Sequence, residues 1–179
     1  MGLTERKYTP PPRTGIEVFE MLPEGTLAEL IYDKIYMSPS PLYSHQQIAG
    51  ELFTQIMLFV KEKQAGVCII SPIDIFLDDK NVLQPDIVFI SKEKMYIIKD
   101  NRIKGCPDLI VEILSPGNEH HDKEIKKEVY EKFGVKEYFI VNPKTKETIA
   151  YFLENNKYVE QTSSTGVIVS QILNNSFSF

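Results

Sequence analysis

The stretch 107–130, PDLIVEILSPGNEHHDKEIKKEVY, is the most informative part of this chain of 179 residues. Positions 109–114 form an apolar run typical of a buried strand, and Glu112 interrupts it. A buried carboxylate is costly unless it is paired, hydrogen-bonded or bound to a cation. Glu112 is therefore the first candidate for a functional residue.

A second acid stands at the mouth of another apolar run, in the segment 84–90, QPDIVFI. Asp86 and Glu112 would lie on two core strands, followed by a lysine-rich helix. Two carboxylates near a strand end, with a backbone carbonyl, make an all-oxygen site suited to Mg²⁺ or Mn²⁺. Asp86 can also be interpreted as a turn residue after Pro85, and we favour that interpretation for Asp108, which follows Pro107.

The helix predicted over 119–133 selects one lysine to face these acids. With Ile125 at 0° and about 100° per residue, the apolar positions define a core-facing stripe that extends to about 80°. Asp122 falls inside the stripe at about 60°, and Lys126 lies at its border at about 100°. Lys127 points away, at about 200°. Alternatively, Asp122 caps the helix start and Lys126 lies over apolar surface with its charge in water.

Three further residues are candidates for the site. Tyr130 lies on the same helix as Lys126, at about 140°. Glu29 belongs to a predicted hairpin, where alternation points it with Ile31; it either completes the acidic cluster or guards an edge strand. His45 begins a predicted helix, where it either contacts phosphate or substrate or lies on the surface.

Composition favours one domain with a real core, because 42% of the residues are hydrophobic. We expect a flexible leader over 1–15 and a single domain over 16–179. There is no secretory signal or membrane-spanning run, and the two cysteines, Cys68 and Cys106, fit reduced core residues; these features predict a cytoplasmic location. The net charge of −5 argues against strong nucleic-acid binding, although lysines and an arginine cluster within 92–104 and 123–127.

Helices and strands alternate through the middle of the chain, which predicts an α/β domain with a mixed central sheet. The expected elements are a hairpin over 28–37, a helix from the N-cap Ser44 to Gly66, strands over 67–77, 85–91, 107–114 and 137–141, a basic loop over 91–106 and a hairpin over 148–161. Residues 162–179 are expected to form a terminal strand pair or an interface segment.

Three motifs together resemble the Uma2 (Uma-two) family of restriction-endonuclease-like proteins. They are PDIVFI, PDLIVEILSP and DxxxKxxxYxxxGVxEYFIVNP, and ELIYDKIYMSPSPLYSHQ near the N-terminus is similar to that family's opening segment. The resemblance covers about residues 17–160. It implies the PD-(D/E)XK nuclease fold, a restriction-endonuclease-like mixed central β-sheet flanked by helices, here with an N-terminal and a C-terminal β-hairpin, commonly in homodimers.

Carried over to this sequence, the resemblance assigns roles to three residues. Asp86 matches the aspartate of the PD motif and Glu112 the acid of (D/E)XK, so both would hold the metal. Leu114 stands where the general motif has lysine, and Lys126 on the following helix matches the position to which this family moves that lysine.

The sequence leaves several functions open. The leading hypothesis is an Mg²⁺- or Mn²⁺-dependent endonuclease that hydrolyses DNA phosphodiester bonds, with Asp86, Glu112 and Lys126 as its catalytic residues. The alternative is a non-catalytic homo-oligomeric or nucleic-acid-binding protein that keeps the nuclease fold. A third is a metal-dependent hydrolase of small phosphate esters, which would need a closed pocket.

Overall fold

A mixed sheet forms the centre of the molecule in the computed structural model, which describes residues 11–116 and 119–179. Its strands run in the order β12-β11-β10-β9-β6-β3, and β13 pairs with β11 at one end. The pair β9 and β10 is parallel, and its described neighbours pair antiparallel. The strands are β3 (Gly66–Ile70), β6 (Ile87–Ser91), β9 (Leu109–Ile113), β10 (Glu137–Val141), β11 (Glu147–Glu154), β12 (Lys157–Glu160) and β13 (Ser164–Thr165).

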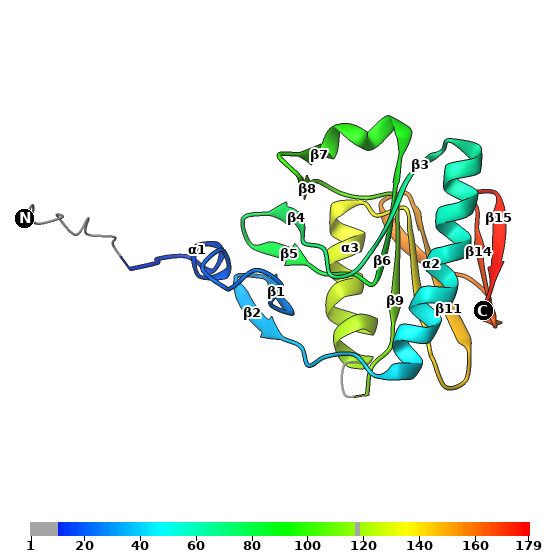
Figure 1. Cartoon of the computed structure of the whole chain (residues 1–179), viewed down its shortest axis with the longest axis horizontal. Coiled ribbons are helices and arrows are strands. Elements are labelled where there is room, and N and C mark those ends of the chain that lie inside the picture. The colour runs from blue at the N-terminus through cyan, green and yellow to red at the C-terminus, as the bar shows by residue number, and fades with distance from the viewer. Residues whose placement is uncertain (1–10, 117–118) are drawn as a thin grey trace, which may run out of the picture.

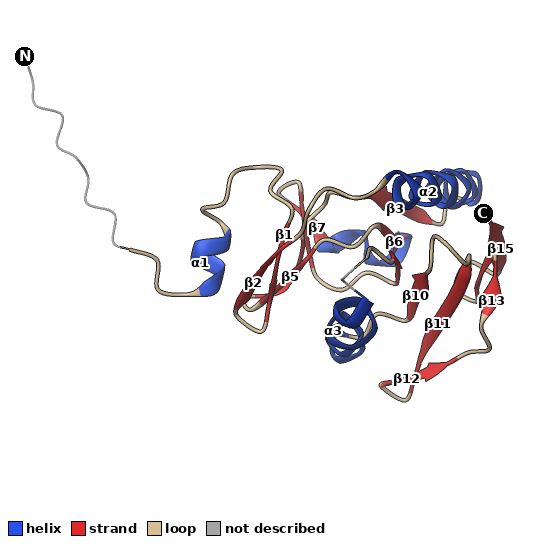
Figure 2. Ribbon diagram, turned by 90° about the horizontal axis from the view of Figure 1, so that it is seen from below, coloured by secondary structure: helices blue, strands red, loops and turns tan. Residues whose placement is uncertain are grey.

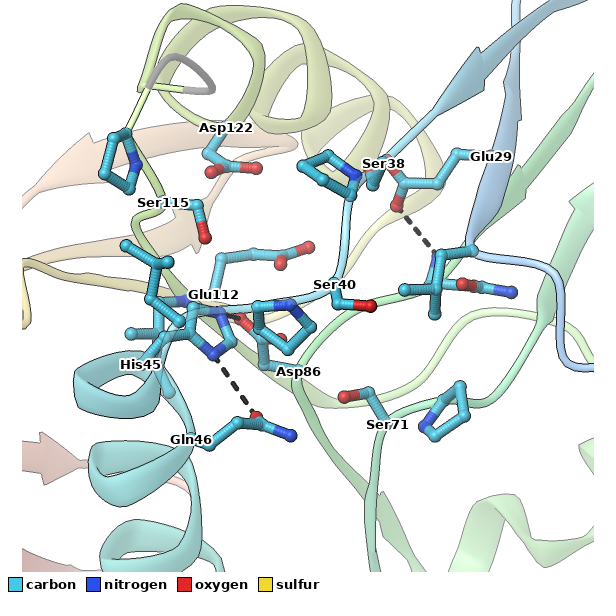
Figure 3. Close-up of a pocket in the computed structure, with 18 of the residues that line it drawn as sticks. Glu29, Ser38, Ser40, His45, Gln46, Ser71, Asp86, Glu112, Ser115 and Asp122 are labelled. Atoms are coloured by element: carbon cyan, nitrogen blue, oxygen red, sulfur yellow. Dashed lines mark hydrogen bonds and ion pairs between the residues drawn. The ribbon is translucent and has the colours of Figure 1, made fainter.

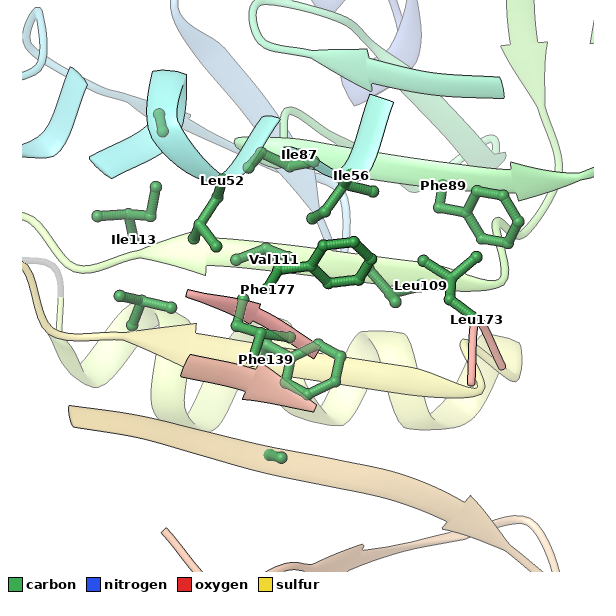
Figure 4. Close-up of a cluster of buried hydrophobic side chains, with 14 of the residues drawn as sticks. Leu52, Ile56, Ile87, Phe89, Leu109, Val111, Ile113, Phe139, Leu173 and Phe177 are labelled. Atoms are coloured by element: carbon green, nitrogen blue, oxygen red, sulfur yellow. The ribbon is translucent and has the colours of Figure 1, made fainter. Parts of the chain in front are cut away.

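Helices cover both faces of this sheet, as Figure 2 shows. The long helix α2 (Tyr43–Lys63) packs on one face, together with the hairpin of β14 (Val167–Ser170) and β15 (Asn175–Ser178). Figure 4 shows Leu52 and Ile56 of α2 beside Ile87 of β6 and above Val111 and Leu109 of β9. The other face packs against α3 (Lys127–Phe133). This arrangement confirms the predicted mixed α/β fold.

Strand β9 is buried along its whole length and alternates between these two cores. Leu109, Val111 and Ile113 face α2, whereas Ile110 and Leu114 pack on the side of α3. The twofold alternation of a strand puts Glu112 on the α3 side. The alternation therefore directs Glu112, the one acid of this strand, toward the helical segment that contains Lys126.

A second sheet, in the order β2-β1-β5-β4-β8-β7, lies to one side of the first (Figure 1). It contains the predicted N-terminal hairpin, and the short helix α1 (Gly15–Phe19) packs on it. Its strands are β1 (Ala28–Ile31), β2 (Lys34–Met37), β4 (Ile75–Asp78), β5 (Asn81–Leu83), β7 (Ile98–Lys99) and β8 (Arg102–Lys104).

Two expected elements that contribute strands to this second sheet were wrong. The single strand predicted over 67–77 is two strands in different sheets, because Pro72 interrupts it. The basic loop predicted over 91–106 contains a 3-10 helix, η1 (Lys92–Ile97), and the strand pair β7–β8.

The first long helix starts two residues earlier than predicted, at Tyr43. Its N-cap is Leu42, which makes no side-chain capping bond, so the assignment of Ser44 as N-cap was wrong. Gln64 ends the helix in a left-handed conformation, before the predicted stop at Gly66. The start of α2 therefore carries no side-chain cap, and it lies beside the cleft described below.

The second predicted helix opens with a π-helical segment, η2 (His121–Lys126), which continues directly into α3. Gly134 ends α3 at φ +86°, a left-handed conformation that glycine adopts without strain, directly after the predicted helix end at 133. Asp122, Lys126, Val129 and Tyr130 are buried, whereas Ile125 is half-buried. The buried stripe is therefore rotated from the predicted one, and Lys126 lies within it instead of at its border.

Both cysteines are free and half-buried, and burial raises the pKa of Cys68 to about 12 and that of Cys106 to about 11. No helix within the described residues is long and apolar enough to cross a membrane. Most of the leader predicted over 1–15 falls outside the described residues, and the boundary between leader and domain stays a prediction; Thr14 caps α1 through a capping box with Glu17.

Candidate active site

A cleft of about 390 Å³ opens where β1, β6, β9, η2 and the start of α2 meet. Figure 3 shows Asp86, Glu112, Asp122, Glu29 and His45 around this opening. Lys126 lines the cleft as well. Six of the seven residues that the sequence singled out therefore meet in one place, although they come from five segments of the chain. The seventh, Tyr130, lies behind Glu112.

Asp86 directly precedes β6 and is fixed by two contacts on one oxygen. Its Oδ2 accepts a hydrogen bond from the backbone N–H of Ile113 at 2.7 Å and lies 3.0 Å from Nε2 of His45. Its Oδ1 accepts no hydrogen bond from a described residue. Asp86 thus has one oxygen committed to the protein and one available to a ligand.

Glu112, like Asp86, has one carboxylate oxygen that is hydrogen-bonded to the protein and one that is not. Its Oε1 accepts a hydrogen bond from Nζ of Lys126 at 3.0 Å and from the hydroxyl of Tyr130 at 2.8 Å. Within the described parts of the chain, nothing donates to Oε2. Glu112 is only 3% exposed, so its free oxygen can be satisfied only through the cleft. The β6–β9 register pairs Ile87 with Val111, and one step further it brings Asp86 beside Glu112.

Lys126 joins three carboxylates from different elements. Its Nζ lies 2.9 Å from Oε1 of Glu29, 3.0 Å from Oε1 of Glu112 and 3.4 Å from Oδ1 of Asp122. The side chain is 7% exposed. The π-helical segment presents Asp122 and Lys126 on one side, and the hydroxyl of Tyr138 supports this turn by donating to the backbone carbonyl of Asp122 at 2.9 Å. π-helical turns are frequent at functional sites.

Glu29 closes the cluster from the second sheet, on the side that alternation predicted. Besides Lys126, its carboxylate contacts Nε2 of His121 at 3.2 Å and accepts the backbone N–H of Gln84 at 2.9 Å. His121 and Gln84 were not candidates from the sequence. Neither residue belongs to a motif that the sequence offered, and no sequence pattern marks a backbone donor such as that of Gln84.

The cluster contains more acids than cations, so some of its acids have a lowered pKa and others a raised one. Burial alone would raise the pKa of Glu29, but Lys126, His121 and Gln84 outweigh it and lower the pKa to about 2. For Glu112, burial and the neighbouring acids outweigh Lys126 and hold the pKa well above its usual value. Burial and Glu29 likewise raise the pKa of Asp122.

The pKa values of the two basic residues, Lys126 and His45, are both raised. Burial alone would lower the pKa of Lys126, but the carboxylates of Glu112, Glu29 and Asp122 outweigh it and hold the pKa well above its usual value. Burial alone would lower the pKa of His45, but its hydrogen bond to Asp86, the charge of Asp86 and weaker contributions from Gln46 and Asp122 together raise it. Lys126 is therefore a permanent cation here, which suits stabilisation of negative charge and not proton abstraction.

The donor set fits a small divalent cation that keeps part of its water shell. The free Oδ1 of Asp86 and Oε2 of Glu112 are carboxylate oxygens, the ligand type that Mg²⁺ and Mn²⁺ prefer. Among the described residues, no three acidic, histidine or cysteine side chains form a ready-made cage. Mg²⁺ is commonly held by one or two carboxylates together with water and substrate phosphates, so two carboxylates are sufficient.

Comparison with known proteins agrees with this fold. A solved structure from Anabaena variabilis, described as "a putative nuclease belonging to DUF820", matches with a TM-score of 0.72 and 18% identity, over 91% of this chain and 92% of that chain. At this identity the likeness shows the fold alone. No curated protein matches the sequence. The model of the Uma2 family, described as "Putative restriction endonuclease", matches residues 16–178. The chain belongs to the Uma2 family.

Proposed function

We propose that this protein is a metal-dependent endonuclease that hydrolyses DNA phosphodiester bonds. The observation that carries this proposal is the pair Asp86 and Glu112, each of which has one oxygen held by the protein and one left to the cleft. Membership of a family described as "Putative restriction endonuclease" supports the same reaction. A homodimer and a cytoplasmic location remain predictions.

In this proposal, Asp86 and Glu112 hold the metal ion. When bound, Mg²⁺ or Mn²⁺ supplies Lewis-acid polarisation of a phosphoryl oxygen and favours ionisation of a water. Lys126 and Tyr130 keep Glu112 in one orientation, and His45 does the same for Asp86. These are positioning contacts, and they leave the free carboxylate oxygens directed at the ligand.

Lys126 has a second part in the reaction. It remains charged, lines the cleft and contacts Glu112, so it can stabilise negative charge that develops on the phosphoryl group. The acids around it keep this charge in place before the substrate arrives. We infer that Glu29 and Asp122 act through Lys126, by fixing the position of its ammonium group.

The test is cleavage of plasmid DNA by the purified protein in Mg²⁺ or Mn²⁺. Wild-type protein should nick or cut the plasmid, and Glu112→Ala and Glu112→Gln should abolish this. Glu137→Gln is a matched control, because Glu137 is a buried glutamate on the neighbouring strand β10, bound to Ser170 and the backbone away from the cleft. Metal-dependent cleavage that survives both Glu112 substitutions would refute the assignment.

One observation favours the alternative of a non-catalytic protein. Lys126 is already surrounded by three carboxylates, and such a closed ionic cluster could serve the fold alone. This alternative predicts no binding of Mg²⁺ or Mn²⁺ that depends on Asp86 and Glu112. Calorimetric titration therefore separates the two functions without any substrate.

A further inference from the structure

Four Ser-Pro dipeptides border the cleft, and they are all the Ser-Pro dipeptides in the sequence. Ser38-Pro39 and Ser40-Pro41 lie between β2 and α2, Ser71-Pro72 follows β3, and Ser115-Pro116 follows β9. Figure 3 shows the four serines around Asp86 and Glu112. Three chain segments thus bring the same dipeptide to one opening.

The backbone at these serines is held in place. The proline ring fixes its own φ, and the residue before a proline is confined to extended conformations. The N–H of Ser38 donates to the carbonyl of Leu27 at 2.9 Å, and that of Ser71 donates to the carbonyl of Asp86 at 2.9 Å. The hydroxyls of Ser38 and Ser71 are therefore carried on a backbone that loses little freedom when a ligand binds, and the following proline restricts the backbone at Ser40 and Ser115.

The hydroxyls themselves have no partner inside the described protein. No hydrogen bond joins the side chain of Ser38, Ser40, Ser71 or Ser115 to another described residue, whereas the hydroxyls of Ser164 and Ser170 elsewhere are hydrogen-bonded within the protein. Ser38, Ser71 and Ser115 are half-buried and Ser40 is exposed, so all four can meet a ligand in the cleft. They are neutral donors beside a cluster with more acids than cations.

We propose that these four hydroxyls bind non-bridging phosphate oxygens of a DNA strand on either side of the scissile phosphodiester, an inference that rests on the proposed function. Serine hydroxyls are common donors to nucleic-acid phosphates. Neutral donors suit this cleft, because lysines at the same positions would pair with its carboxylates instead of the substrate. Such contacts bind the strand without requiring positive charge from a chain whose net charge is −5.

The test measures binding of a labelled DNA strand of about 12 nucleotides by fluorescence anisotropy, in Ca²⁺, a cation that also takes oxygen ligands. Each Ser→Ala substitution should raise Kd about two- to tenfold, and the quadruple variant at least about tenfold. Ser→Thr variants, which keep the hydroxyl, should recover binding. Ser163→Ala and Ser176→Ala, at exposed sites outside the cleft, should leave Kd unchanged.

Two further measurements identify the group that the serine hydroxyls contact. They are the salt dependence of Kd and the Kd for a strand with a modified backbone. Neutral hydroxyls release no counterions, so the ratio of variant to wild-type Kd should stay constant between about 50 and 200 mM KCl. In a methylphosphonate strand of the same sequence, a methyl group replaces one non-bridging oxygen of each linkage and the other oxygen loses its negative charge. Each hydroxyl contact is then lost or weakened, so this ratio should fall toward one. A ratio that persists with this strand would assign the hydroxyls to sugars or bases and overturn the proposal.

The serine proposal and the nuclease proposal fail in different ways. If wild-type protein cleaves DNA while the quadruple Ser→Ala variant keeps the wild-type Kd and KM, the serine proposal is wrong and the nuclease proposal stands. If no ion supports cleavage but the serine variants weaken binding as described, the nuclease proposal is wrong, and the hydroxyls bind phosphates of a strand that the protein does not cut. Thermal unfolding of each variant shows whether a weaker Kd comes from loss of the fold, and failure of the wild type to bind the strand overturns the serine proposal.

Discussion

Strand β9 has a buried acid at each end, and the two acids lie in opposite electrostatic surroundings. Asp108, directly before the strand, has Nζ of Lys136 at 2.9 Å, Nζ of Lys94 at 3.3 Å and the backbone N–H of Ser91 at 2.9 Å. Glu112, near the other end, shares Lys126 with Glu29 and Asp122. One end of the strand has two cations for one acid, and the other has three acids for one lysine.

The pKa values follow this difference. Burial alone would raise the pKa of Asp108, but Lys136, Ser91 and Lys94 outweigh it and lower the pKa. The pKa of Glu112 is held well above its usual value, by burial and by its acidic neighbours. A buried acid with its own cations stabilises a fold, whereas an excess of buried acids at a cleft is suited to a cation from outside. Burial alone therefore does not identify a functional acid.

The largest expected effect comes from removing the lysine at each end. Lys126→Met leaves three buried carboxylates without their common cation and should lower the free energy of unfolding by about 3–5 kcal/mol. Lys136→Met is the matched change, and it should cost about 1 kcal/mol or less, because Lys136 is 56% exposed and Asp108 keeps Lys94. Urea unfolding measures both. Equal losses would contradict the contrast between the two ends.

A smaller effect is expected from Asp108→Asn. The substitution removes the acid from two ion pairs and should cost about 2 kcal/mol, while metal-dependent cleavage per folded molecule stays at the wild-type level. Chemical denaturation and the plasmid assay, run on the same preparation, check the two halves of this prediction. A large loss of cleavage in folded Asp108→Asn would show that Asp108 takes part in the reaction, which would contradict the contrast between the two ends of β9.

The pH dependence of the same variant sharpens this prediction. The folded-state pKa of Asp108 is lowered below its usual value of 3.8, so its contribution to stability is present above that value and is lost as the pH falls through the folded-state pKa. The stability difference between wild type and Asp108→Asn should therefore be full at pH 6 and shrink below about pH 4. A difference that does not change with pH would show that the charge of Asp108 is not responsible.

The smallest effect is expected from Tyr130→Phe. It removes one of the two donors to Oε1 of Glu112 and leaves Lys126 in place, so cleavage should fall about tenfold with a modest change in stability. Tyr158→Phe is the control, because the Tyr158 hydroxyl has no hydrogen-bond partner among the described residues. If Tyr130→Phe and Tyr158→Phe changed kcat equally, Tyr130 would not be a positioning residue for Glu112.

The sequence was sufficient for much of the fold and for the main acids. Apolar runs identified β6, β9 and β10, and an acid within such a run identified Glu112, because a strand buried on both faces leaves few places for charge. Helical periodicity correctly preferred Lys126 to Lys127, whose ammonium group lies 4.3 Å from the ring centre of Tyr151.

Other features depend on contacts that local sequence does not encode. Periodicity at 100° per residue could not foresee the π-helical turn that rotates Tyr130 into the core. The contacts of His121 and Gln84 with Glu29 link segments far apart in the chain. Asp108 had been interpreted as a turn residue, and it does lie in a bend, but its ion pairs with Lys94 and Lys136 appear only after folding.

The most direct test of the central claim, that Asp86 and Glu112 leave two oxygens for a metal ion, is calorimetric titration with Mn²⁺. Wild-type protein should bind the ion, Asp86→Asn and Glu112→Gln should each abolish or strongly weaken binding, and Asp108→Asn should bind like wild type. No binding by the wild type, or equal binding by all four proteins, would contradict the account.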